Sequence, residues 1–365
     1  MTRDDRMKRL CAYVVLVLLC SASALAAAGE EQEPRTETIL LDRSGFWRCF
    51  YVLKPPVVVH DDGRVETLPY PSADTPFPPK TWKDVDFDDS SWDRQRGATF
   101  PATQNTWSAL AQWNVGAVYL NTSSPALAMI AVRGKFRVTD PARVKGLKLT
   151  VQYRGGVAVY LNGREIARKH PAAGKGTDES ALAERYPKEA YLYPDGTLLN
   201  HDYAKEKEMK DRYLLRTRQL ADVSVPSELL RKGTNVVAIE LRRAPYDALL
   251  LEEQKGMKHP RETWRALWDT CSMVGFRMTA ERSEGVEPNV VRPQGVQVWN
   301  SAVLAPDFDL DFADPNEPLR PIEVVGTRGG SFSAKVVVGS SEAIRKLRAS
   351  VSALRSRGGG VILPS

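Results

Sequence analysis

The 365-residue sequence has few of the residues that build metal centres. It holds four cysteines and four histidines, and none of them stands in a Cys-x-x-Cys or paired Cys/His spacing. A tetrahedral zinc site needs such closely spaced ligands, so none is predicted. The sequence also lacks a Gly-x-x-x-x-Gly-Lys phosphate loop and a Gly-x-Ser-x-Gly nucleophile elbow. These absences exclude the best-marked nucleotide-binding and serine-hydrolase sites.

The chain also lacks a concentrated block of one charge. Its 51 basic and 45 acidic residues are interleaved, and the formal net charge is only +6. A nucleic-acid-binding protein normally concentrates lysine and arginine in a stripe or patch. No nucleic-acid partner is therefore predicted, and a hydrophobic content of 42% is enough to build a core.

The sequence has no hydrophobic run long enough to span a membrane. Its N-terminal part contains an apolar run at residues 10–19. Basic residues precede it and small residues with an Ala24-x-Ala26 pattern follow it. Its length of about 10 residues is half of what a membrane-spanning helix needs. Residues 1–28 are therefore interpreted as a secretory signal peptide, with an uncleaved anchor as the alternative. We expect a secreted or periplasmic (cell-envelope) protein with no membrane association after cleavage.

Short alternating segments dominate the middle of the chain. Residues 147–153 and 235–243 place apolar side chains on one face, which is the period-two pattern of a half-buried strand. Residues 157–161 and 164–168 flank Asn162-Gly163, a strong signal for a type I′ hairpin turn. In residues 133–138, Arg133 and Lys135 alternate with Phe136 and Val138. These patterns predict an antiparallel sheet with one face in a core and one face in water.

Two stretches interrupt the strand pattern. Residues 169–220 are charged and contain weak helical patches at 179–185 and 203–215, and residues 245–268 contain a second such region. Both are interpreted as excursions from one sandwich. Residues 226–230 are expected to form one helical turn before the strand at Asn235.

An aspartate- and proline-rich stretch, residues 306–320, is predicted as a linker. Its aspartates are Asp307, Asp309, Asp311 and Asp314. They suggest a calcium loop, but the stretch lacks the central glycine and terminal glutamate of an EF-hand. Alternation with Phe308, Leu310 and Phe312 fits a strand end with exposed carboxylates better. No cofactor is therefore predicted, and structural calcium stays an open alternative.

Several of these segments resemble a known family in sequence order. Trp82, followed by Val85-Asp86-Phe87-Asp88-Asp89-Ser90-Ser91-Trp92, resembles the opening of galactose-binding-domain-like jelly rolls, as found in the sugar-binding domain of β-galactosidases and β-glucuronidases. The segments at 136, 159–163 and 233–240 resemble later landmarks of that fold. The resemblance covers about residues 37–305 and implies an all-β jelly-roll sandwich. A tight turn is expected at Asp88 to Ser91, and Trp92 is expected to plug the end of the sandwich.

The tail carries a second resemblance. Residues 323–326 and 329–338 resemble the start of the β-sandwich that precedes the catalytic barrel in β-N-acetylgalactosaminidase-like glycoside hydrolases. Residues 321–365 are therefore expected to form an incomplete second β-sandwich with exposed apolar side chains, and 344–354 fit either helix or strand. The expectation is an N-terminal piece of a longer polypeptide with a catalytic domain beyond Ser365. No residue here can receive that family's catalytic Asp-Glu pair.

Export leaves one cysteine pair, Cys49 and Cys271, because Cys11 and Cys20 lie in the predicted signal peptide. Jelly rolls place early and late strands side by side, and an oxidising compartment permits pairing. A disulfide between Cys49 and Cys271 is predicted.

The candidate ligand-binding residues are aromatic and amide side chains in residues 104–121, which are rich in glutamine, asparagine, serine and threonine. A sugar face stacks on an aromatic ring while polar neighbours bind its hydroxyls. The candidates are Trp107, Trp113, Asn114 and Tyr119. The alternative is that these rings cap the hydrophobic core.

No catalytic constellation is recognisable, since the carboxylate pairs are adjacent in sequence and a glycosidase pair normally comes from separate elements. Three functions follow. The first is a non-catalytic carbohydrate-binding or accessory module of a secreted glycan-processing protein. The second is a structural sandwich that docks against a downstream glycoside hydrolase domain without binding sugar. The third is an enzyme with a site in residues 169–220.

Overall fold

The computed structural model describes residues 37–68, 74–96, 126–171, 181–199, 209–252, 270–303, 307–327, 329–356 and 358–362. The predicted signal peptide, residues 1–28, lies outside them and stays a prediction. Within the described residues, no helix is both long and apolar enough to cross a bilayer.

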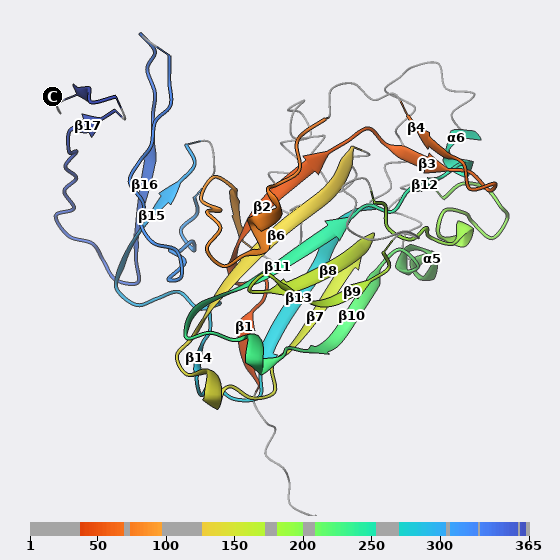
Figure 1. The fold of residues 1–365 in the computed structure, drawn as a ribbon, viewed down its shortest axis with the longest axis horizontal. Coiled ribbons are helices and arrows are strands. Elements are labelled where there is room, and N and C mark those ends of the chain that lie inside the picture. Colours follow the sequence, from red (N-terminus) through yellow and green to blue (C-terminus); the bar gives the residue numbers. More distant parts are fainter. Residues whose placement is uncertain are drawn as a thin grey trace, which may run out of the picture. The chain divides into compact units, whose positions relative to one another are not determined.

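Two antiparallel sheets form the body of the structure (Figure 1). The smaller sheet has four strands in the order β1 (Thr38–Leu41), β13 (Ser272–Ala280), β7 (Lys148–Arg154) and β10 (Arg218–Ser224). The larger sheet has seven strands in the order β5 (Asp93–Arg96), β2 (Phe46–Leu53), β6 (Leu127–Val138), β11 (Gly233–Arg242), β8 (Gly156–Leu161) and β9 (Arg164–Lys169), with β14 (Val286–Glu287) pairing to β6. The predicted all-β sandwich is confirmed.

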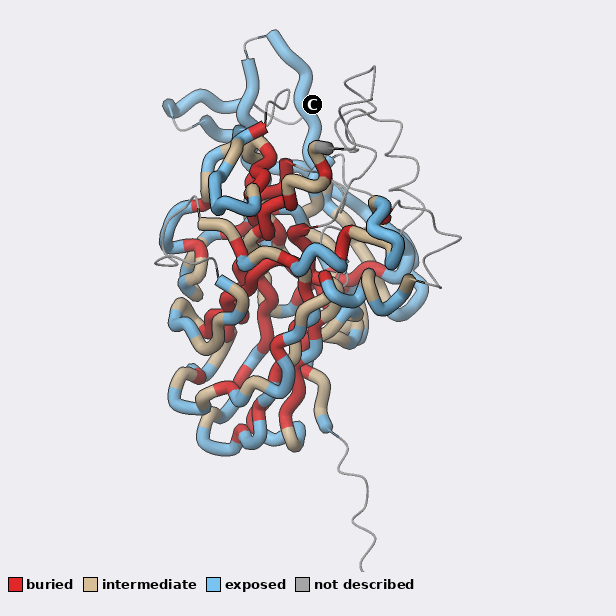
Figure 2. Tube along the Cα trace, turned by 90° about the vertical axis from the view of Figure 1, so that its right-hand side faces the viewer, coloured by how far each residue is buried: buried red, intermediate tan, exposed pale blue. Residues whose placement is uncertain are grey.

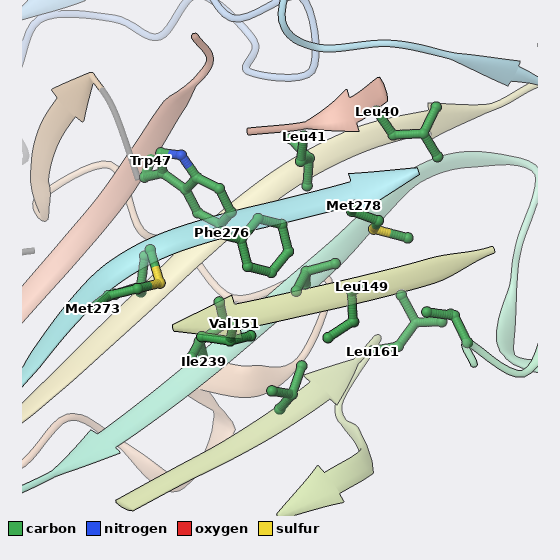
Figure 3. Close-up of a cluster of buried hydrophobic side chains, with 14 of the residues drawn as sticks. Leu40, Leu41, Trp47, Leu149, Val151, Leu161, Ile239, Met273, Phe276 and Met278 are labelled. Atoms are coloured by element: carbon green, nitrogen blue, oxygen red, sulfur yellow. The ribbon is translucent and has the colours of Figure 1, made fainter. Parts of the chain in front are cut away.

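The core lies between these two sheets, and the alternating residues face it as the sequence predicts (Figure 3). Leu149 and Val151 of β7 meet Ile239 of β11 in one buried cluster. Trp47 of β2 packs edge-on against Phe276 of β13, with ring centroids 4.9 Å apart. Gly134 lets the Trp47 ring approach β6, because a Cβ there would lie 2.4 Å from a ring carbon.

The Asn162-Gly163 turn joins β8 to β9 as predicted. Both residues have positive φ, 51° and 87°, which a type I′ turn requires. The Asn162 amide donates to the Asn235 carboxamide oxygen at 2.8 Å, which ties the turn to the start of β11. The predicted helical turn before that strand is present as a 3-10 turn, η4 (Ser227–Leu229).

The described parts of the two excursions form a second buried cluster beside a three-stranded sheet. That sheet contains β3 (Val57–Val59), β4 (Val65–Thr67) and β12 (Tyr246–Asp247). Around it lie η3 (Lys188–Ala190), α5 (Lys210–Leu214) and α6 (Leu249–Glu252). Tyr191 is buried in this cluster. Helix α5 falls within the predicted patch at 203–215, whereas the described residues of the patch at 179–185 are not helical.

The outer face of the seven-stranded sheet is covered by protein, which differs from the expectation of a wet face. Residues 74–96, including η1 (Lys80–Lys83), lay Trp82 and Trp92 on Phe50 of β2 and Met129 of β6. Trp92 therefore packs on a sheet face, and the expectation that it plugs the end of the sandwich is wrong.

The C-terminal region adds two separate two-stranded sheets. In one, β15 (Val296–Ser301) pairs with β16 (Lys335–Ser340), and in the other β17 (Leu354–Arg355) pairs with β18 (Val361–Ile362). The described chain from 344 to 353 is neither helix nor strand. Most of its residues are exposed, while the buried ones concentrate in the sandwich (Figure 2). β15 lies within residues 37–305, which were expected to form the first sandwich, but it pairs with β16. The incomplete second β-sandwich over residues 321–365 stays a prediction.

Candidate functional site

The four candidate ligand-binding residues, Trp107, Trp113, Asn114 and Tyr119, lie outside the described residues. Their role in sugar binding stays a prediction. The tryptophans that the structure does describe are all buried, at 7% exposure or less: Trp47, Trp82, Trp92 and Trp299. The described surface therefore presents no tryptophan ring on which a sugar could stack.

The predicted disulfide is absent, because neither Cys49 nor Cys271 is bonded to another cysteine. The neighbours of β2, which carries Cys49, are β5 and β6, whereas those of β13, which follows Cys271, are β1 and β7. The early strand that lies beside β13 is β1, whose sequence Thr38–Leu41 contains no cysteine, whereas Cys49 is carried by β2 of the other sheet. Both side chains are buried, and burial raises the pKa of the Cys49 thiol well above its ordinary value.

A cluster of buried charges, here called the outer-face ion cluster, lies on the outer face of the seven-stranded sheet. It consists of Arg48, Asp89, Arg133, Lys135 and Glu317. The carboxylate of Asp89 accepts from Arg133 Nε at 2.7 Å and from Lys135 Nζ at 2.8 Å. Burying a charge is costly unless it is paired, so these contacts are needed for the sheet to be covered.

Asp89 belongs to the Asp-Asp-Ser-Ser-Trp run, residues 88–92, which forms a local turn and also supplies a buried ion-pair partner. Asp88 accepts from the backbone N–H of Ser90 at 3.0 Å, which is the local turn that the sequence predicts. Asp89 reaches inward to the two cations of β6. Arg133 also donates to the backbone carbonyls of Trp82 and Asp84, which fixes this loop on the sheet.

The predicted linker packs on the sandwich. We call residues 307–320 the strap. Glu317 of the strap accepts from Arg48 through both oxygens, at 2.9 and 2.5 Å, and from Lys135 at 2.7 Å. Burial alone would raise the pKa of Glu317, but the hydrogen bonds from Arg48 and the charge of Lys135 hold it far below its ordinary value.

The strap aspartates are engaged in hydrogen bonds of their own. Asp307 accepts from Lys335 Nζ at 2.6 Å and Ser301 Oγ at 2.9 Å, and Asp311 accepts from the backbone of Phe308 at 2.9 Å. Asp311 and Asp314 are buried, contrary to the exposed carboxylates that the sequence predicts. No group of three or more histidine, cysteine or carboxylate side chains within the described part of the chain could hold a metal ion.

A groove opens between residues 85–96 and the strap. Arg320 of the strap pairs with Asp88 across it at 2.5 Å, and Lys335 of β16 pairs with Asp307 of the strap at 2.6 Å. These pairs join the strap and β16 to the rest of the groove. The ion pairs in the groove therefore hold the strap and β16 against residues 85–96.

The two-stranded sheet of β15 and β16 has two different faces. Residues directly opposite each other in an antiparallel pair share a face, so the register places Val298 beside Val338 and Trp299 beside Val337. On one face Trp299 is buried over Gly339 and its Nε1 donates to Asp307 at 3.4 Å. On the other face lie four valines, here called the valine face: Val296, Val298, Val336 and Val338.

The valine face is part of a wider apolar surface. Val296 is 63% exposed, Val298 39% and Val336 46%. Among the described residues, only three exposed large apolar side chains lie outside 291–362, and they are Val65, Leu214 and Leu215. Soluble proteins seldom expose so much apolar surface in one region unless it binds something.

The outer-face ion cluster is what the sequence reasoning missed. Arg133 and Lys135 interrupt an otherwise apolar strand, and this is the local signal that could have marked them. Their outward direction was predicted, but their burial was not, because the covering residues come from distant parts of the chain.

Comparisons with known proteins concern the fold. No family model matches the chain, and no curated protein matches its sequence. Similar solved structures include a glycosyl hydrolase family 2 member from Bacteroides cellulosilyticus (12% identity, TM-score 0.28) and β-glucuronidases from Bacteroides uniformis (10%, 0.29) and Bifidobacterium dentium (11%, 0.29). The alignments cover 71%, 73% and 74% of this chain but only 22%, 20% and 33% of those proteins.

Proposed function

We propose that this chain is a non-catalytic accessory β-sandwich of an exported glycan-processing protein, and that it docks onto a catalytic domain through residues 291–362. The glycan context rests on the galactose-binding-domain-like motifs, above all Trp82 with the Asp88 to Trp92 run. The sandwich supports it, since the later segments that resemble this fold, at 136, 159–163 and 233–240, lie in β6, at the β8–β9 turn and in β11 of one sheet.

The observation that carries the docking role is the apolar surface of the C-terminal region. A two-stranded hairpin is marginally stable in water, and a sheet with an apolar face needs a covering layer. The two-stranded sheet of β15 and β16 is fixed on its Trp299 face by the strap, while valines on its other face are exposed. A protein surface on the partner would cover the valines and complete the layer.

The arrangement of charges supports a non-catalytic role. A glycosidase needs two carboxyl groups on either side of one substrate bond. Two of the carboxylates that line the groove, Asp89 and Glu317, are tied to arginine and lysine. A carboxylate held in this way is not available to transfer a proton.

An apolar dye tests the docking surface. The folded chain is expected to bind 8-anilinonaphthalene-1-sulfonate, and the triple variant Val296→Thr/Val298→Thr/Val336→Thr is expected to lose most of that fluorescence with little change in thermal midpoint. Val65→Thr is the matched control, because Val65 is a strand valine that is 58% exposed outside the surface. Equal dye binding by the triple variant and the wild type would sink the docking proposal.

A second candidate function is glycan binding by residues 104–121, which combine aromatic rings with amide and hydroxyl side chains. Trp113→Ala and Trp107→Ala would remove the stacking platforms. On a glycan array, both variants should lose a signal that the wild type gives, while the thermal midpoint stays the same. An unchanged signal would show that these rings do not bind sugar.

A further inference from the structure

The strap is held on the sandwich by contacts to three elements of the larger sheet. Phe312, which is 2% exposed, packs edge-on against Phe46 of β2, with ring centroids 5.0 Å apart. The guanidinium of Arg94 in β5 lies 3.5 Å from the centre of the Phe46 ring and donates to the carbonyl of Phe312. Glu317 supplies the charged anchor to Arg48 and Lys135.

The two buried carboxylates of the strap have different partners. Glu317 accepts charge-assisted hydrogen bonds from two cations. Asp314, only 5% exposed, accepts instead from the Asn289 amide at 2.9 Å and from the backbone N–H of Asn316 at 2.8 Å, which are neutral donors. The charges of Lys135, Arg48 and Arg94 favour the ionised carboxylate from a distance, but none of these cations donates a described hydrogen bond to it, and the cost of desolvation outweighs their attraction.

The surroundings of Asp314 also hold more acceptors than donors. The side-chain oxygens of Asn289 and Asn316 are buried, and neither accepts a hydrogen bond from the described residues. Both residues already donate to Asp314. A proton on the Asp314 carboxyl would add a donor to a site that is rich in acceptors.

We propose that the strap is a pH-dependent latch, which binds the sandwich most tightly when Asp314 carries a proton and Glu317 does not. Protonation of Asp314 removes from the interior a charge that is hydrogen-bonded only by neutral donors. Ionised Glu317 keeps the charged anchor to Arg48 and Lys135. Asp307 of the strap binds Trp299 of β15 and Lys335 of β16. When the latch loosens, the strap therefore no longer fixes the two-stranded sheet of β15 and β16.

The pKa shifts give the window. Burial, with the nearby charge of Glu317, raises the pKa of Asp314 from 3.8 to about 6, while the pKa of Glu317 is lowered from 4.5. Asp314, whose pKa is raised when the strap is bound, increasingly favours the bound state as pH falls below that raised pKa. Glu317, whose pKa is lowered when the strap is bound, increasingly disfavours the bound state as pH falls below its ordinary pKa. The latch therefore tightens steadily as pH falls below about 6, is tightest between about pH 3.8 and 4.5, and loosens again at lower pH.

The other charged groups around Asp314 come from every element packed against the strap. They are Arg48 of β2, Arg94 of β5, Lys135 of β6, Asp89 of the covering loop and Asp311 of the strap itself. Guanidinium and ammonium groups ordinarily keep their charge between pH 4 and 8. Asp89 is paired with two cations. Asp314 is thus the group that sets the upper limb of the pH dependence.

Hydrogen exchange of the strap peptide tests the latch, with rates at pH 5 and 7.5 corrected for intrinsic exchange. Wild-type protection is expected to fall about tenfold or more from pH 5 to 7.5, since a pKa shift of this size changes the binding equilibrium by that order. Asp314→Asn, which keeps the shape and loses the charge, should hold its protection within about twofold. Asp309→Asn is the control, because Asp309 is exposed on the same strap.

A peptide from β7 reports whether each variant keeps the sandwich folded. Glu317→Gln should lose strap protection at both pH values while β7 stays protected. The proposal fails if wild type and Asp314→Asn show the same pH profile, if Asp309→Asn abolishes the dependence, or if Glu317→Gln leaves the strap protected.

Discussion

At the scale of single residues, Arg133 lies on the outer face of a sheet, yet its side chain has no exposed surface. It pairs with Asp89 and donates to two backbone carbonyls of the covering loop. Removing one partner of a buried pair leaves the other charge buried and uncompensated, which costs more than the pair itself contributes. The buried ion cluster therefore fixes how the loop sits on the sheet.

Arg133→Met is expected to lower the free energy of unfolding by about 3–5 kcal/mol, because Asp89 loses a partner and two carbonyls lose their donor. Arg137→Met is the matched control on the same strand, where the side chain is 53% exposed and pairs with Glu287 at 3.5 Å. Its cost should be about 0.5 kcal/mol or less. Urea denaturation of both variants measures the difference, and equal losses would contradict the role of the cluster.

Gly134 provides a second test at this scale. A Cβ there would lie 2.4 Å from the Trp47 ring, so Gly134→Ala is expected to cost about 1–3 kcal/mol through overpacking. Gly275→Ala is the control, because the nearest atom to a Cβ there is 3.5 Å away. Thermal unfolding should separate the two variants clearly; a Gly134→Ala midpoint equal to that of Gly275→Ala would be inconsistent with this packing.

The cysteines give a chemical test. Cys49 and Cys271 are expected to resist iodoacetamide in the native protein and to be alkylated in guanidinium chloride without a reductant, because both are buried thiols. Peptide mass spectrometry reads each position separately. A peptide pair that is released only by reduction would restore the disulfide that the sequence suggested.

At the scale of elements, local patterns predicted well and distant pairings did not. The alternation in β7 and β11 and the Asn162-Gly163 turn are properties of neighbouring residues, so the sequence was enough to place them. Arg48 and Glu317 are 269 positions apart, and no local pattern announces their contact. The strap looked like a linker because its proline and aspartate content is also that of an exposed segment.

The two-stranded sheet of β15 and β16 is expected to depend on Trp299, which anchors it to the strap. Trp299→Ala is expected to increase amide exchange throughout β15 and β16, because the ring over Gly339 and the bond to Asp307 are lost. Val298→Ala, on the open face, should leave exchange nearly unchanged. Hydrogen-exchange mass spectrometry compares the two, and a larger effect of Val298→Ala would mean that the wrong face has been assigned as the anchor.

At the scale of the whole molecule, the sandwich and the C-terminal region differ in how they bury their apolar side chains. The inner faces of the two sheets are buried in the apolar core. Residues 74–96 and the strap pack on the outer face of the seven-stranded sheet. The C-terminal region leaves its apolar side chains open. The sequence predicted exposed apolar side chains for residues 321–365 from their few strands, because a two-stranded unit cannot bury an apolar face alone.

The most direct test of the docking proposal is hydrogen exchange of the chain with and without glycoside hydrolase catalytic barrels, purified without their own sandwiches. A barrel that binds should slow exchange in β15 and β16, and Val296→Thr/Val298→Thr/Val336→Thr should weaken that binding while Val65→Thr does not. Protection confined to residues 104–121, or no protection with any barrel in the panel, would contradict docking through the valine face.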